Sequence, residues 1–159
     1  MAQEQQVDAR GRDTFAVQIE GRAYSLADAG NSPLHIPFTY QNRTGRTVYP
    51  ARCGEHPPNF ILEKWVEGRW IRAYEPVCAL ILIPEPVAVG PGEAHTDTLM
   101  LHTAPNFRRS VFQVDDIPGT YRAVLKVYRT WDVHDPSAAK PGELLPEQQT
   151  TSHSFQLLP

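Results

Sequence analysis

The stretch GTYRAVLKVYRT, residues 119–130, decides the fold class. Side chains in a β-strand alternate between the two faces of the sheet. One face of this stretch is apolar and the other mixed: Tyr121, Ala123, Leu125 and Val127 against Arg122, Val124, Lys126 and Tyr128. The period of two predicts a strand with one buried face and one face that can meet water. This pattern is typical of an antiparallel sheet.

The same alternation recurs on both sides of this stretch and predicts further short strands. They lie at residues 15–19, 24–26, 34–40, 60–66, 70–74, 94–101 and 151–159, with an apolar run at 78–83. Gly21 and Arg22 predict a hairpin turn, and Gly68 predicts another with a positive φ angle. Residues 26–32 are compatible with one helical turn, and residues 132–146 read as a long loop.

Eight to ten short strands separated by Gly and Pro turns predict an all-β protein, a β-sandwich in preference to a barrel. The chain has 159 residues, 41% of them hydrophobic, which fits a single domain with a substantial core. We expect one domain over residues 1–159, with residues 1–12 as a flexible lead-in.

Charge and hydropathy exclude several classes of function. The net charge is −3 with 21% charged residues, and no cluster of Lys and Arg suited to nucleic acid is present. The longest apolar run, residues 79–84, is too short to span a bilayer. We therefore expect neither a nucleic-acid partner nor a membrane-spanning segment.

The order of LHIPFTYQNRTGRTVYPARC, FILEKWVEGRW, EPVCALIL, VAVGPGEAHTDTLML, IPGTYRAVLKVY and SHSFQL carries a resemblance. Over roughly residues 34–157 the chain resembles the immunoglobulin-like β-sandwich modules of bacterial envelope proteins and lipoproteins. It is more distantly similar to the sandwich of bacterial intracellular proteinase inhibitors. The resemblance implies an antiparallel sandwich with Greek-key connections and identifies no functional site.

Tyr121 follows Pro118, Gly119 and Thr120, which is the layout of a tyrosine corner. In such a corner the tyrosine hydroxyl bonds back to the backbone before the strand. We predict this role for Tyr121, with a simple core aromatic as the alternative. The second position after it is Ala123, so the inter-sheet disulfide of antibody domains is absent.

The two cysteines, Cys53 and Cys78, predict a disulfide, because the hairpin between them would bring its ends together. Two buried free thiols are the alternative. Zinc is disfavoured, because His56 is the only nearby third ligand. A nucleophilic thiol activated by His56 is a minority interpretation, since no partner acid or oxyanion-hole loop is recognisable.

Trp65, Trp70 and Tyr74 are the best candidates for an exposed binding surface, although core packing explains at least one of the tryptophans better. Trp65 and Trp70 lie on opposite arms of the predicted hairpin, a placement that allows them to stack as a cross-strand pair. Arg108 and Arg109 are the candidate inhibitor loop. The Asp132, His134 and Asp135 group is better explained as a solvated loop than as a metal site. Asn42 begins a short glycosylation sequon of the kind that arises by chance.

These observations favour a non-enzymatic interaction or accessory module of the cell envelope that binds a protein or carbohydrate through its loops. The alternatives are a proteinase inhibitor that presents Arg108 or Arg109, and a thiol or metal enzyme at Cys53 and His56. We expect no cofactor, no bound metal and a monomer. No signal peptide is recognisable at the N-terminus, which fits either a mature exported chain or a cytoplasmic protein. Because the predicted disulfide requires an oxidising compartment, we expect a periplasmic or secreted protein, with a cytoplasmic protein as the alternative.

The disulfide prediction is tested by intact mass after alkylation of the denatured protein, with and without prior reduction. We expect alkylation of both cysteines only after reduction, because bridged sulfur atoms do not react with the alkylating reagent. By closing a loop of this size, the disulfide would stabilise the folded protein by about 3–4 kcal/mol. Labelling of both thiols without reductant would contradict the bridge and weaken the case for export.

Overall fold

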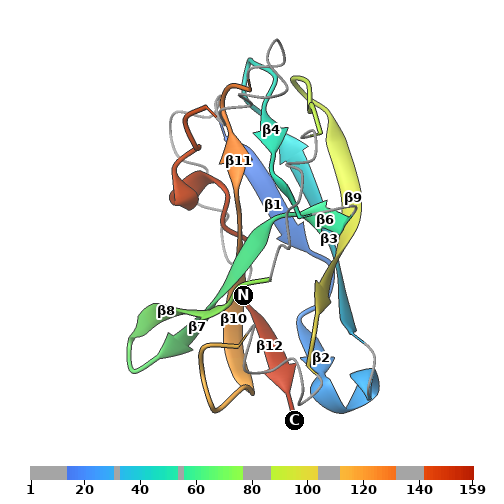
Figure 1. Ribbon diagram of the computed structural model, residues 1–159, viewed down its shortest axis with the longest axis vertical. Coiled ribbons are helices and arrows are strands. Elements are labelled where there is room, and N and C mark those ends of the chain that lie inside the picture. The colour runs from blue at the N-terminus through green and yellow to red at the C-terminus, as the bar shows by residue number, and fades with distance from the viewer. Residues whose placement is uncertain (1–13, 31–32, 54–55, 77–86, 104–111, 132–141) are drawn as a thin grey trace, which may run out of the picture.

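The computed structural model describes residues 14–30, 33–53, 56–76, 87–103, 112–131 and 142–159, with only the backbone at positions 53, 56 and 57. Its described part is made of strands and two short 3₁₀ helices, without an α-helix (Figure 1). The fold is therefore all-β, as the sequence predicts. No helix in these ranges is long and apolar enough to cross a membrane.

Two larger sheets form the body of the molecule (Figure 1). The three-stranded sheet has the order β1-β3-β9, and its pairs are antiparallel. Its strands are β1 (Phe15–Ile19), β3 (Leu34–Asn42) and β9 (Ala94–Leu101). The five-stranded sheet has the order β2-β12-β10-β7-β8. Its strands are β2 (Ala23–Ser25), β12 (Phe155–Leu158), β10 (Gly119–Leu125), β7 (Phe60–Val66) and β8 (Arg69–Tyr74).

Short strand pairs and 3₁₀ turns complete the described fold. The strand β4 (Tyr49–Pro50) pairs with β11 (Val127–Tyr128), and β5 (Arg52–Cys53) pairs with β6 (His56–Pro58). The 3₁₀ helix η1 (Leu26–Ala29) occupies the predicted helical turn, and η2 is Glu147–Gln149. The predicted lead-in and the apolar run at residues 78–83 lie outside the described residues.

One hydrophobic cluster joins the two larger sheets. On β3 the alternation is complete, and the inward set Leu34, Ile36, Phe38 and Tyr40 is buried against residues of the five-stranded sheet. Phe155 and Leu157 of β12 point inward, as their spacing predicts. Burial of apolar surface contributes about 25 cal/mol per Å² to the free energy of folding. The hydrophobic effect in this shared core is therefore the main interaction that holds the two sheets together.

The β7–β8 hairpin has the predicted turn at Gly68. Glu67 and Gly68 both have positive φ angles, 49° and 82°. Two such residues between paired strands make the tight turn whose twist matches that of the strands. The turn sets the register and places Trp65 directly opposite Trp70.

Two sequence predictions of strand connection are wrong. Residues 15–19 and 23–25 do not form a hairpin, because β1 pairs with β3 whereas β2 joins β12 in parallel in the other sheet. The chain changes sheets here, and the amide of Gln156 donates to the carbonyl of Arg22 at 2.8 Å. The predicted strand at 121–128 also divides into β10 and β11 at Lys126. The amide of Lys126 donates to the carbonyl of Asn59, and the carbonyl of Lys126 accepts from the amide of Ala51.

The mixed face of β10 is less open than predicted. Val124 is buried there although Arg122 on the same face stays partly exposed. Thr151 forms a bridge with Val124, so the segment before β12 lies beside this end of β10. This segment covers Val124, whereas the side chain of Arg122 reaches solvent.

The turn before β10 is held by two side chains. The hydroxyl of Tyr121 donates to the carbonyl oxygen of Ile117 at 2.5 Å, which is the geometry of a tyrosine corner. The ammonium group of Lys64, a buried residue of β7, donates to the carbonyl oxygen of Asp116 and lies 3.6 Å from its carboxylate. These contacts fix the entry of the chain into β10.

Asn42 at the end of β3 is fully buried, with 0% exposure. Its side-chain amide donates to the carbonyls of Arg46 and Val89 at 2.7 and 2.8 Å. Its carbonyl oxygen accepts from both the amide and the hydroxyl of Thr44. The Asn side chain of the sequon is therefore enclosed in the folded protein and serves to hold the following turn.

We expect Tyr121→Phe to lower the free energy of unfolding by about 1–3 kcal/mol, because a buried carbonyl loses its donor while the ring still packs. Urea denaturation measures the change. The control is Tyr49→Phe, whose hydroxyl makes no hydrogen bond within the described ranges and should change stability by less than about 0.5 kcal/mol. Equal effects of the two substitutions would contradict a specific corner.

Stability should also fall above pH 10. Burial raises the pKa of Tyr40 to about 12 and raises the pKa values of Tyr74 and Tyr121 above the ordinary value of 10.0. The unfolded chain loses these protons first, so the stabilisation is complete below pH 10 and is lost as the pH rises through the folded pKa values. Denaturant midpoints measured from pH 8 upward, with tyrosinate absorbance, test this. A midpoint that stays constant through pH 11 would contradict it.

Candidate functional site

The surface of the five-stranded sheet that faces away from the core, here called the outer face, carries the strongest cluster of exposed functional groups. On β7 and β10 the residues Leu62 and Ala123 are buried in the core. Because side chains alternate, their neighbours Glu63 and Arg122 point to the outer face. The register pairs Glu63 with Arg122 on one side and with Arg72 on the other.

Trp65 and Trp70 form a cross-strand pair on the hairpin, as predicted. Their ring centroids are 5.1 Å apart and the rings are inclined at 63°. Trp65 is 46% exposed, whereas Trp70 is half-buried. Trp70 therefore packs against the ring of Trp65, which is exposed to solvent near the hairpin turn.

Arg122 connects this aromatic pair to the middle of the sheet. Its guanidinium carbon lies 4.5 Å from the centroid of the Trp70 ring, within the range of a cation–π contact. Its Nε and Nη2 atoms lie 2.6 and 2.5 Å from one carboxylate oxygen of Glu63. These two contacts hold a rotamer-rich side chain in one position.

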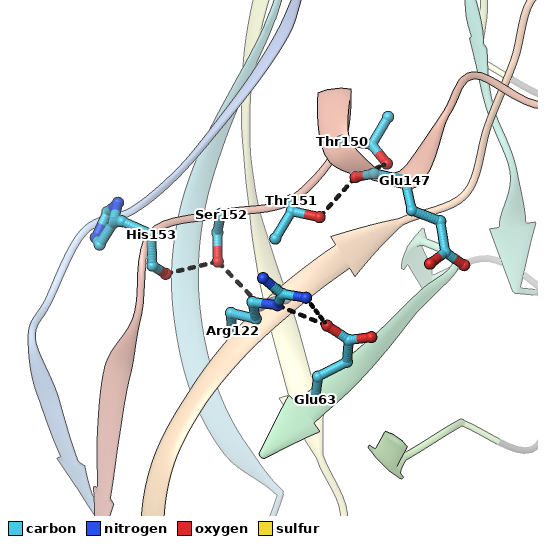
Figure 2. Close-up of polar contacts among 8 residues, drawn as sticks. Glu63, Arg122, Glu147, Thr150, Thr151, Ser152 and His153 are labelled. Carbon is cyan, nitrogen blue, oxygen red and sulfur yellow. Dashed lines mark hydrogen bonds and ion pairs between the residues drawn. The ribbon is translucent and has the colours of Figure 1, made fainter. Parts of the chain in front are cut away.

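A hollow with a partly polar lining opens beside Arg122. Its lining residues are Arg122, Glu147, Gln148 and Thr151, and its volume is about 510 Å³. Figure 2 shows the segment at residues 147–153 crossing beside β10, with the Glu147 side chain and the Arg122 guanidinium on neighbouring elements. The hollow thus presents both hydrogen-bond donors and acceptors.

Side-chain hydrogen bonds fix the segment at residues 147–153, which carries Glu147, Gln148 and Thr151 of the hollow. The hydroxyls of Thr151 and Thr150 donate to the carbonyl of Glu147 at 2.6 and 3.3 Å (Figure 2). The hydroxyl of Ser152 accepts from the amide of Ala123 at 2.9 Å and donates to the carbonyl of His153. The rim of the hollow is therefore tied to β10.

Tyr74 does not belong to an exposed surface, which corrects the sequence prediction. It is fully buried, and its ring contacts Phe60 and Phe112. Its hydroxyl accepts from the amide of His102 at 3.1 Å. A register shift in β7 between Leu62 and Glu63 accompanies this change of face along the hairpin.

The other predicted sites fall mainly outside the described part. Cys53 and His56 are backbone partners across β5 and β6, but their side chains and Cys78 are not described, so the disulfide stays a prediction. The same holds for the inhibitor-loop residues Arg108 and Arg109 and for the group at residues 132–135. Among the described side chains, no three His, Cys, Asp or Glu residues are grouped to share a metal ion.

Sequence reasoning did not identify Glu63, Arg122, Gln148 or Thr151 as site residues. The alternation in β7 and β10 puts Glu63 and Arg122 on outer faces, but it cannot show that strands so distant in sequence are neighbours. The last two residues belong to a segment without a periodic pattern. A prediction of which strands pair was the missing information.

Comparisons with known proteins identify no family for this chain. No family model matches it, and a search of curated proteins finds no similar sequence. Among solved structures it is similar to the Pseudomonas fluorescens alkylpurine DNA glycosylase AlkC bound to DNA containing an abasic site analogue. The identity is 10% and the TM-score 0.41, and the match covers 94% of this chain and 32% of that one. The chain thus spans about a third of the glycosylase chain, and likeness at this level carries no argument about function.

Proposed function

We propose that this protein is a non-enzymatic binding module of the bacterial cell envelope and that its outer face binds a carbohydrate chain. The observation that carries the proposal is a row on one face of the sheet. It runs from the exposed ring of Trp65 through Trp70 to the fixed guanidinium of Arg122 and then to the polar hollow.

A sugar ring has an apolar face of C–H groups and an edge of hydroxyls, and the row offers a partner for each. Trp65 supplies a large, rigid aromatic surface that loses little conformational entropy on contact. Arg122 and Gln148 donate hydrogen bonds, while Glu147 accepts them and Thr151 has a hydroxyl. A chain of several sugars can contact the ring and the hollow together.

A protein partner is less well supported. Stable protein interfaces bury about 800 Å² on each partner around an apolar centre. The large exposed hydrophobic residues of the described ranges are Trp65, Leu144 and Leu158, and the sheet order places β12, with Leu158, on the other side of β10 from Trp65. A single ring surrounded by polar groups suits a sugar better than a protein surface.

The finer fold assignment and the location form part of the same proposal. The two sheets on a shared core and the bond from Tyr121 to Ile117 support an immunoglobulin-like sandwich with Greek-key connections. Envelope location rests on the predicted disulfide between Cys53 and Cys78.

The test is affinity electrophoresis of the purified protein through gels that contain soluble polysaccharides, followed by calorimetry with oligosaccharides of the best polymer. We expect Trp65→Ala to weaken binding about tenfold, because one aromatic contact and its buried area contribute roughly 1–2 kcal/mol. Leu158→Ala is the matched control, since it removes a similarly exposed apolar side chain elsewhere in the sheet, and it should leave binding unchanged.

Three outcomes would contradict the carbohydrate proposal. The first is no retardation by any polysaccharide of a panel that includes peptidoglycan fragments, glucans and chitin oligomers. The second is equal binding by Trp65→Ala and Leu158→Ala. The third is capture of an envelope protein that depends on Trp65 when no polysaccharide binds, which would identify the outer face as a protein interface.

A further inference from the structure

A second hollow, which shares no lining residue with the first, lies near β4 and β11, which Figure 1 shows at the end opposite the β7–β8 turn. It lies between the turn after β3 and the segments around residues 129 and 145–149, and its volume is about 390 Å³. Cavities of about 300–1,000 Å³ accommodate small organic ligands. Its lining includes Thr44, Arg46, Val48, Arg129, Leu145 and Gln149.

Two arginines from different parts of the chain, Arg46 and Arg129, line this hollow. Arg46 has no carboxylate within ion-pair distance among the described residues. Arg129 has one, Glu143, with 3.6 Å between the nearest nitrogen and oxygen, and the Glu143 side chain is 75% exposed. An exposed ion pair at this distance is weak, so a bound anion can displace it.

The floor of the hollow is apolar. Val48 and Leu145 are buried core residues that also line it. The amide of Leu145 donates to the carbonyl of Val127 at 2.8 Å, and Val48 exchanges two backbone hydrogen bonds with Val89. The floor is therefore fixed to the sandwich and offers a surface for a hydrophobic group.

The backbone that carries both arginines is fixed before any ligand arrives. The carbonyl of Arg46 accepts from the side chain of Asn42 at 2.7 Å and from the hydroxyl of Thr44 at 2.9 Å. The amide of Arg129 donates to the carbonyl of Glu143 at 2.8 Å. Preorganised backbone lowers the conformational cost of binding.

We propose that this hollow binds a small organic anion, with a carboxylate or phosphate between Arg46 and Arg129 and an apolar body against Val48 and Leu145. Guanidinium groups match both oxyanions through paired N–H donors. Gln149 and Thr44 at the rim add polar contacts. The two hollows share no lining residue, although the segment at residues 145–151 contributes to both. Arg46 and Arg129 line this hollow alone, so substituting them tests this proposal and Trp65→Ala tests the carbohydrate proposal.

Titration of the ¹⁵N-labelled protein with phenyl phosphate, benzoate and neutral benzyl alcohol tests the site by backbone amide shifts. We expect saturable shifts at residues 44–48, 129, 145 and 149 with at least one of the two anions, weakened by added salt, and no saturable shifts with benzyl alcohol. Saturation by phenyl phosphate alone assigns a phosphate ligand, and saturation by benzoate alone assigns a carboxylate.

Substitution of both arginines separates the two charges from general surface effects. We expect Arg46→Gln with Arg129→Gln to weaken anion binding at least tenfold. Arg43→Gln is the matched control, because Arg43 lies in the same exposed turn but does not line the hollow, and it should change the affinity less than twofold. The ¹⁵N spectrum of each variant reports whether it is folded.

The proposal is overturned if neither anion gives saturable shifts or if benzyl alcohol binds as well as the anions do. It is also overturned if the folded double variant binds as the unchanged protein does. A loss of affinity equally large in Arg43→Gln would show general charge attraction rather than this site.

Discussion

The contacts that hold the turn before β10 determine much of the five-stranded sheet. Tyr121 and Lys64 both point into the protein and bind adjacent carbonyls, those of Ile117 and Asp116. They are also register partners across β10 and β7. A slip of one residue would move both polar groups to the wrong face and leave the carbonyls of Ile117 and Asp116 without these donors. This corner therefore fixes the register of the central strand against its neighbours.

The outer face depends on the same register. Arg122 follows Tyr121 directly, so fixing the inward tyrosine aims the arginine outward, where Glu63 is opposite. Glu63 and Trp65 are two residues apart on β7, and the turn at Glu67 and Gly68 sets Trp70 beside Trp65. The row of site residues is thus a consequence of one corner and one tight turn.

Alternation in the sequence was enough to predict the strand content, the inward residues of β3 and β12, and the pairing of Trp65 with Trp70. These features follow from local period-two patterns and from a turn whose residues have specific φ angles. The failures have a non-local cause. The Gly21 turn changes sheets instead of closing a hairpin, and the strand at 121–128 divides where Lys126 pairs with Asn59 and Ala51.

The same limit applied to the site. Local spacing proposed Tyr74 as exposed, but a register shift and the contacts with Phe60 and Phe112 bury it. Lys64 is buried where the pattern of β7 requires an inward residue, and its long chain lets the ammonium group reach the Asp116 carbonyl. No local pattern predicts which remote segment will cover a residue or satisfy its charge.

The two proposed surfaces differ in how a ligand is held. On the outer face, Arg122 is already bound by Glu63 and covers Trp70, so its position is set during folding and its charge is largely neutralised. Recognition there depends on shape and hydrogen bonds. At the other hollow, buried Asn42 fixes the backbone of Arg46 but leaves its guanidinium group without a carboxylate partner in the described ranges. Attraction there is mainly electrostatic and therefore sensitive to salt. One scaffold thus combines an ordered face with a charged hollow, because Glu63 fixes the guanidinium group of Arg122 whereas Asn42 fixes only the backbone of Arg46.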